Sequence, residues 1–209
     1  MKNIKHITHP LIEHKLSILR DVKTDPFQFR MLIDEISYLL IFEACRDLEL
    51  KDISVQTPVS LAKCKKVKTK VMICPILRAA LGMLDAVFKI IPDASVGFLG
   101  FQRDEKSLEA NFFYAKLPDD YKNRTAIIID PMFATGGTAI EAVKFLKQKG
   151  VNDIKFISII AAPEGLKRFS EIYPDVNVYV SAIDKTLNEK GYIVPGLGDA
   201  GDRVFNTIN

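Results

Sequence analysis

Residues 125–138 constrain the fold of this chain more than any other stretch. Three consecutive isoleucines at 127–129 form a short β-branched run, which is typical of a parallel strand covered on both faces. Asp130 follows where that strand would end, and Gly136 and Gly137 precede a helical pattern of apolar residues. Because glycines leave backbone N–H groups uncovered at the start of a helix, this order predicts an α/β fold with a phosphate-binding loop.

Other interpretations of the glycine-rich segments compete with this one. An ordinary strand-to-helix connection has the same spacing and stays open. A P-loop is disfavoured because it needs a lysine before its final Ser/Thr, whereas Gly137 is followed directly by Thr138. Residues 196–201 match the dinucleotide fingerprint G-x-G-x-x-G, but that fingerprint must open a helix inside a βαβ unit. Only eight residues follow Gly201, so we reject nicotinamide or flavin binding.

The loop from Asp130 to Thr138 resembles the phosphoribosyl diphosphate (PRPP) loop of the type I phosphoribosyltransferases. Most members of that family carry two adjacent acidic residues here, whereas the uracil branch has Asp-Pro, as in Asp130-Pro131. Further segments that resemble the uracil branch are 9–16, 76–79 and 191–203. The resemblance extends along essentially the whole chain. Two positions depart from it, since we expect glycine at Ala80 and leucine at Phe133.

The resemblance implies a reaction, its substrates and a cofactor. Uracil N1 attacks the anomeric carbon of PRPP, which releases diphosphate and gives uridine monophosphate. Mg²⁺ is expected as the cofactor, held mainly through PRPP and water near Asp199 with no direct protein ligand. Relatives include forms activated by guanosine triphosphate (GTP), so GTP is a candidate effector. We expect a homo-oligomer, a dimer or tetramer, with no nucleic-acid or membrane partner.

The resemblance also assigns residues to three groups. The catalytic group is Arg78, Arg103, Asp130 and Asp199. The PRPP-binding group contains those four residues together with Pro131, Met132, Phe133, Ala134, Thr135, Gly136, Gly137 and Thr138. The uracil-binding group is Ile193, Gly198, Asp199 and Ala200. Arg78 and Arg103 both follow expected strands, and ligands of parallel sheets gather at the carboxyl ends of the strands, so both arginines should reach one site.

Alternating helix and strand signals predict one domain over residues 1–209. Its core is expected at about 68–182 and a C-terminal hood at about 183–209. We expect a mostly parallel twisted sheet flanked by helices, the type I phosphoribosyltransferase fold, with an N-terminal helical extension and a β-hairpin arm. The expected strands are 71–74, 95–101, 111–116, one beginning at 126, 154–160 and 176–180, with a hairpin turn near 104–107. The expected helices begin at Pro26 after an Asp25 cap, at Ala80 (ending at Ile91), at Ala139 and at Pro163.

Composition favours a folded protein of the cytoplasm. Apolar residues make up 48% of the chain, yet no run of eighteen apolar residues and no signal-peptide pattern occurs. Cys45, Cys64 and Cys74 lack metal-type spacing, so we expect free thiols that pack in the core. The histidines, at 6, 9 and 14, match no metal motif and are expected at the surface. A net charge of +3 is too small to indicate nucleic-acid binding.

A basic run leaves a second class of function open. It consists of Lys63, Lys65, Lys66, Lys68 and Lys70, and we expect it to be a solvated loop. Some pyrimidine phosphoribosyltransferase relatives act as RNA-binding regulators. The alternative is therefore an RNA-binding regulator of the same fold with weak or no catalysis. The PRPP loop at 130–138, or donor loop, and the C-terminal hood are both intact, which favours the enzyme.

Overall fold

The computed structural model describes residues 1–103 and 110–207, so the expected hairpin turn at 104–107 lies outside the described residues. The strands of its main sheet are β1 (Ile4–His6), β4 (Val71–Leu77), β5 (Ser95–Val96), β6 (Phe98–Arg103), β7 (Ala110–Lys116), β8 (Thr125–Ile129), β9 (Met132–Phe133), β10 (Ile154–Ala161) and β11 (Asn177–Ile183). The helices are α1 (Pro10–Arg20), α2 (Pro26–Ala44), α3 (Leu84–Ile90), α4 (Gly137–Gln148), α5 (Pro163–Ile172) and α6 (Ala200–Phe205), with 3₁₀ turns η1 (Ala79–Met83) and η2 (Tyr121–Asn123). Two further hairpins pair β2 (Leu50–Gln56) with β3 (Leu61–Val67) and β12 (Thr186–Leu187) with β13 (Ile193–Val194).

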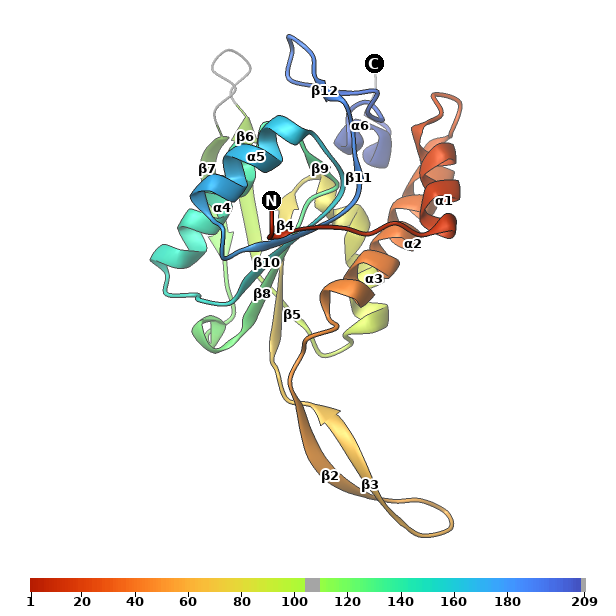
Figure 1. Ribbon diagram of the computed structural model, residues 1–209, viewed down its shortest axis with the longest axis vertical. Coiled ribbons are helices and arrows are strands. Elements are labelled where there is room, and N and C mark those ends of the chain that lie inside the picture. Colours follow the sequence, from red (N-terminus) through yellow and green to blue (C-terminus); the bar gives the residue numbers. More distant parts are fainter. Residues whose placement is uncertain (104–109, 208–209) are drawn as a thin grey trace.

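The main sheet is mostly parallel, as the sequence predicts. Its strand order is β1-β11-β10-β8-β4-β6-β7, with β5 beside β4 and β9 beside β10. Along this path only β6 and β7 pair antiparallel. Helices α4 and α5 cover one face of the sheet, and α1, α2 and α3 lie on the other side (Figure 1). The predicted fold class is therefore confirmed.

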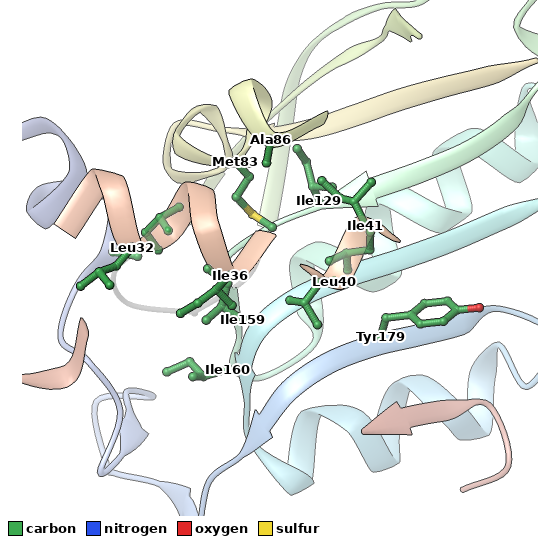
Figure 2. Packing of buried hydrophobic residues seen from close by; sticks show 14 of the residues in the cluster. Leu32, Ile36, Leu40, Ile41, Met83, Ala86, Ile129, Ile159, Ile160 and Tyr179 are labelled. Carbon is green, nitrogen blue, oxygen red and sulfur yellow. The ribbon is translucent and has the colours of Figure 1, made fainter. Parts of the chain in front are cut away.

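Successive residues of the central strands face two different cores. Ile127 and Ile129 belong to the core on the side of α2, whereas Ile128 belongs to the core on the side of α4. Figure 2 shows side chains of α2, such as Ile36, packed against Ile159 of β10. Because both faces of the sheet are buried, its strands are nearly continuous apolar runs, which made them recognisable in the sequence.

Helix α2 begins as its sequence predicts. The Asp25 carboxylate accepts a hydrogen bond of 2.8 Å from the Gln28 N–H, and Pro26 occupies the first helical position. The helix expected over 80–91 is instead divided into η1 and α3. Gly82 lies within η1, where an added Cβ would come within 3.3 Å of side chains on α2 and α6, and glycine is a weak helix former.

The largest departures from prediction lie in the first 70 residues. β1, α1 and the β2–β3 hairpin, which projects from the body (Figure 1), were not expected. Lys63, Lys65 and Lys66 lie in β3, so the expected loop is wrong there, although the whole basic run is exposed. Cys74 is fully buried as expected, but Cys64 lies in the projecting hairpin and packs in no core. All three cysteines are free thiols.

The histidines and the C-terminal segment agree with the sequence-based expectations. His6, His9 and His14 are all exposed, and His9 caps α1 by accepting the Leu11 N–H through Nδ1 at 3.1 Å. The glycine pattern at 196–201 does lead into helix α6, but the described chain contains no strand after that helix. None of the helices within residues 1–103 and 110–207 is long and apolar enough to cross a membrane.

Candidate active site

A cavity of about 740 Å³ lies where β4 and β8 end, against the start of α4 and the hood. The predicted residues that line it are Arg78, Asp130, Met132, Phe133, Ala134, Thr135, Gly136, Gly137, Thr138, Ile193, Gly198, Asp199 and Ala200. Pro131 does not line it, because its carbonyl faces β10 and accepts the N–H groups of Ile159 and Ile160 at 3.2 and 3.1 Å. Arg103 is the last residue of β6, and its side chain lies outside the described part of the structure.

The loop between β8 and α4 presents backbone donors to the cavity. Gly136 caps α4 in the left-handed region, with φ +75°, and an added Cβ would lie 2.9 Å from the Gly165 carbonyl oxygen. The first N–H groups of α4, at Gly137, Thr138 and Ala139, have no acceptor within the helix. The positive end of the helix macrodipole coincides with them. This end of α4 is suited to binding an anion such as phosphate.

The middle of the loop is fixed by the sheet and by an aromatic cluster. β9 places Met132 and Phe133 beside Ile160 and Ala161 of β10. The Phe133 ring packs edge-on against Phe156 and Phe169, with ring centroids 5.1 and 5.4 Å apart. The phenylalanine that replaces the expected leucine therefore fills the core beneath the loop. Ala80, the other departure, is likewise fully buried.

Asp130 has a strongly shifted pKa. Although its carboxyl group reaches the cavity, burial raises the pKa of Asp130 to about 7. The Met132 N–H, 3.3 Å from Oδ1, opposes this shift, and the negative charge of Asp199 adds to it. The Asp130 carboxyl is thus poised to change its charge near neutral pH.

Arg78 follows β4 and holds only a weak partner. The peptide bond between Leu77 and Arg78 is cis. The Arg78 Nη2 lies 3.3 Å from Asp202 Oδ1, and its side chain is 60% exposed. Its guanidinium is 5.8 Å from the centroid of the Phe205 ring. Exposed ion pairs of this kind contribute little stability, so Arg78 can exchange Asp202 for an anionic ligand at small cost.

The hood supplies main-chain groups to the opposite wall of the cavity. Asp199 caps α6 by accepting the Asp202 N–H at 2.9 Å, which leaves the N–H groups of Ala200 and Gly201 without a helical acceptor. Gly198 has φ +82°, a conformation that favours glycine, and Ile193 is almost fully buried. These residues offer backbone donors and acceptors in a wall that also carries polar side chains such as Glu189 and Lys190.

Three residues without an assigned role in the sequence connect the hood to the body. Arg20 and Asp184 form an ion pair, and Arg203 donates to the carbonyls of Leu19, Asp21 and Leu197 at 2.9, 2.6 and 2.8 Å. Arg203 ends the segment 191–203 that carries the family resemblance, which is a weak signal for it. Arg20 and Asp184 carry no local signal.

Comparison with known proteins identifies the family of this chain. Residues 6–207 match the family model for uracil phosphoribosyltransferase. The chain is 77% identical to the uracil phosphoribosyltransferase of Campylobacter concisus over 208 residues, covering 100% of both. Protein AQ2163 of Aquifex aeolicus has a similar structure, with a TM-score of 0.91 and 39% identity over 97% of each chain. Adenine phosphoribosyl transferase of Trypanosoma brucei shares the fold, with a TM-score of 0.61 at 11% identity over 95% of this chain and 89% of that one. The chain belongs to the uracil phosphoribosyltransferase family.

Proposed function

We propose that the protein binds PRPP and uracil in this cavity and transfers the 5-phosphoribosyl group to uracil N1. The products are uridine monophosphate and diphosphate, and the reaction serves pyrimidine salvage. The observation that carries this proposal is that the start of α4, Asp130 and the main-chain groups of the hood line one cavity. A site for the phosphate, a carboxylate for the sugar hydroxyls and a site for the nucleobase therefore lie next to one another. Membership of a pentosyltransferase family supports the same reaction.

The donor loop is suited to the phosphorylated sugar. The first N–H groups of α4, together with the hydroxyls of Thr135 and Thr138, bind the 5-phosphate, which is favoured there by the helix dipole. The Asp130 carboxylate accepts hydrogen bonds from the ribose hydroxyls. Because those hydroxyls donate to the charged form, donor binding stabilises the deprotonated Asp130.

The leaving diphosphate requires positive charge. Arg78 supplies a planar, bidentate donor at the end of β4, and Arg103 ends the neighbouring strand β6. Asp130 and Asp199 are among the carboxylates that line the cavity, and their oxygen atoms suit Mg²⁺ held there through PRPP and water. Mg²⁺ bound to the PRPP diphosphate would neutralise charge on the leaving group.

Protein groups need not form a covalent bond in this reaction. The transition state resembles an oxocarbenium ion, so the rate depends on alignment of uracil N1 with the anomeric carbon and on charge placed at the diphosphate. The donor loop and the hood hold the two reactants from opposite walls of one cavity. This arrangement accounts for alignment without a nucleophilic side chain.

A base-panel assay tests the proposal. PRPP, MgCl₂ and one base at a time, chosen from uracil, cytosine, orotate, adenine and hypoxanthine, are incubated with the protein, and nucleotide and diphosphate are measured. We expect uridine monophosphate and diphosphate in equal amounts from uracil, and little product from the other bases. GTP added to parallel reactions tests the candidate effector. Absence of product from uracil at any Mg²⁺ concentration would rule the proposal out.

The RNA-binding alternative is weakened by the charges around the basic run. Lys65 pairs with Asp52 at 2.5 Å, Lys68 with Glu49 at 2.9 Å and Lys70 with Asp120 at 3.0 Å. The three neighbouring carboxylates lower the net positive charge of this surface, whether or not each exposed pair stays formed. An RNA titration over a salt series distinguishes the two functions. An RNA-binding regulator should bind RNA with an affinity that falls steeply as the salt concentration rises, whereas the enzyme does not need to bind RNA.

The projecting hairpin supports a homo-oligomer. Isolated two-stranded hairpins are marginally stable in water, yet Leu50, Val55, Leu61 and Val67 of β2 and β3 are exposed. We infer that a second copy covers them in a dimer or tetramer, which light scattering measures. The free thiols fit a reducing compartment such as the cytoplasm, and fractionation of cells tests that location.

A further inference from the structure

The hood contains a turn whose main chain is tightly folded. It spans residues 193–196, and Gly196 has φ +67°. A Cβ at Gly196 would lie 2.1 Å from the Ile193 carbonyl oxygen, so the chain folds directly back on a residue that lines the cavity. Movement of Gly196 therefore moves Ile193 as well.

Both polar groups of Gly196 are held by one ion pair. The Gly196 N–H donates to Asp184 Oδ2 at 2.8 Å, and its carbonyl accepts from Arg20 Nη1 at 2.6 Å. Arg20 also binds Asp184 through both nitrogens, Nη1 to Oδ2 at 2.8 Å and Nη2 to Oδ1 at 2.5 Å. The Asp184 side chain is 5% exposed and that of Arg20 23%, so water competes weakly for these contacts.

The ion pair joins the turn to the body of the protein. The Asp184 N–H donates to the Ala161 carbonyl at the end of β10 at 2.8 Å. The next residue, Lys185, donates its N–H to the Val194 carbonyl at 3.0 Å. Arg20 is the last residue of α1, so the pair also connects the turn to the N-terminal helices. None of Arg20, Asp184 and Gly196 lines the cavity, so the ion pair acts on a bound base indirectly, through the turn that ends in Gly196 and begins at Ile193.

We propose that Arg20 and Asp184 are positioning residues that hold the turn at Gly196 in the geometry needed to bind uracil. This inference rests on the proposed function, because it assigns the hood wall to the base. Backbone groups that select a nucleobase by hydrogen bonding must be held in place. Donors and acceptors that are already fixed lose no conformational entropy when the base binds. The Arg20 and Asp184 side chains contact the turn rather than the donor loop, so their loss should weaken uracil binding more than PRPP binding.

Steady-state kinetics of Arg20→Lys tests this. Lysine keeps the charge but replaces the planar fork with one compact donor, which cannot serve both the Asp184 carboxylate and the Gly196 carbonyl. We expect the KM for uracil to rise about tenfold or more, as for a lost charge-assisted hydrogen bond, while the KM for PRPP changes less than about twofold. Asp184→Asn, which is isosteric, should act in the same direction and serves if the lysine variant does not fold.

The matched control is Lys15→Gln. Lys15 also lies on α1 and forms an ion pair with Glu35 of α2 at 2.7 Å, but that pair does not contact the hood. The control should leave both KM values unchanged. Addition of guanidinium ions to Arg20→Ala should lower its KM for uracil toward that of the parent.

Three outcomes can be told apart. An unchanged KM for uracil in folded Arg20→Lys and Asp184→Asn would refute the positioning role, and so would an equal rise in both KM values, which indicates general loosening. The parent enzyme is assayed alongside the variants. If the parent does not use uracil, the proposed function itself fails, whatever the variants do.

Discussion

The guanidinium of Arg203 lies over the ring of Phe29, 4.2 Å from its centroid, and so joins the hood to helix α2. Phe29 is fully buried, and Arg203 also donates to carbonyls on both sides of this contact, those of Leu19 and Leu197. One side chain thus fixes the segment that carries Gly198 and Ala200 to the N-terminal helices. The hood is part of the folded body through this contact, although its hydrogen-bonded strands are short.

Arg203→Lys should therefore lower stability. Lysine cannot stack a planar group on Phe29 or donate to several carbonyls in fixed directions. We expect the free energy of unfolding to fall by about 1–3 kcal/mol, measured by urea denaturation. Arg168→Lys, at an exposed position of α5, is the control and should change the free energy of unfolding little. A variant as stable as the parent would show that the stacking and carbonyl contacts contribute nothing.

The donor loop gives a prediction from two adjacent glycines. A Cβ at Gly137 meets only Thr135 Oγ1 at 3.5 Å, so Gly137→Val should fold normally, but its methyl groups would cover the phosphate donors. Gly136→Ala should be destabilised by at least about 1–2 kcal/mol, because φ there is +75° and the added Cβ would also lie 2.9 Å from the Gly165 carbonyl oxygen. Calorimetry with PRPP and thermal unfolding separate the two effects. If folded Gly137→Val binds PRPP as tightly as the parent, the phosphate site lies elsewhere.

Asp130 predicts a pH dependence of stability. Its pKa is about 7 in the folded protein and 3.8 without the fold, so between these values the folded state binds more protons than the unfolded state. The free energy of unfolding therefore falls as pH rises from about 4 to 7. Asp130→Asn removes this loss and should be more stable than the parent at pH 8, by at most about 4 kcal/mol, with no difference below pH 4. Urea denaturation across this pH range measures it.

The same variant should lose donor binding. Asparagine cannot provide a charged acceptor for the ribose hydroxyls, so a more stable protein should bind PRPP less tightly. In the parent, kcat/KM for PRPP should decline as pH falls below about 7, because Asp130 becomes protonated. Unchanged PRPP affinity in Asp130→Asn would separate the carboxyl from the sugar site.

Parts of this molecule could be predicted from sequence because burial leaves a local pattern. β8 and β10 are buried on both faces and read as apolar runs, and Asp130 follows β8 directly. β2 and β3 are exposed on nearly every residue, so no alternation marked them as strands. Arg20 and Asp184 are 164 residues apart, and only tertiary folding brings them together. The ion pair that connects the hood to the body could therefore be identified only from the structure.

Arg78 gives a prediction about the leaving group. Arg78→Lys keeps the charge but loses the planar fork, so turnover should fall about tenfold or more. Asp202→Asn is the control, because it removes the negative charge that faces Arg78 at 3.3 Å and leaves the guanidinium itself unchanged. Its turnover should match the parent's. If turnover fell equally in both variants, the interaction between Arg78 and Asp202 would be what matters, and Arg78 would not act by binding diphosphate.

Base choice should depend on the main chain of the hood. Uracil presents carbonyl acceptors at O2 and O4 on either side of a donor at N3. Cytosine instead has an amine donor in place of O4 and an unprotonated ring nitrogen, an acceptor, at N3. The N–H groups of Ala200 and Gly201 have no helical acceptor, so they can donate to a base but cannot accept from one. Cytosine would leave buried groups unpaired, at about 1–3 kcal/mol for each.

We therefore expect kcat/KM for cytosine to be at least about thirtyfold below that for uracil, which corresponds to two unpaired groups at about 1 kcal/mol each. Ala200→Ser retains the main chain and should preserve this ratio. Gly198→Val should damage uracil use, because φ there is +82° and the added side chain would lie against Arg203, with Cβ 3.7 Å from its Cδ, at a residue that lines the cavity. Initial rates with both bases measure these ratios. Similar efficiency with cytosine and uracil in the parent would mean that fixed backbone groups do not select the base.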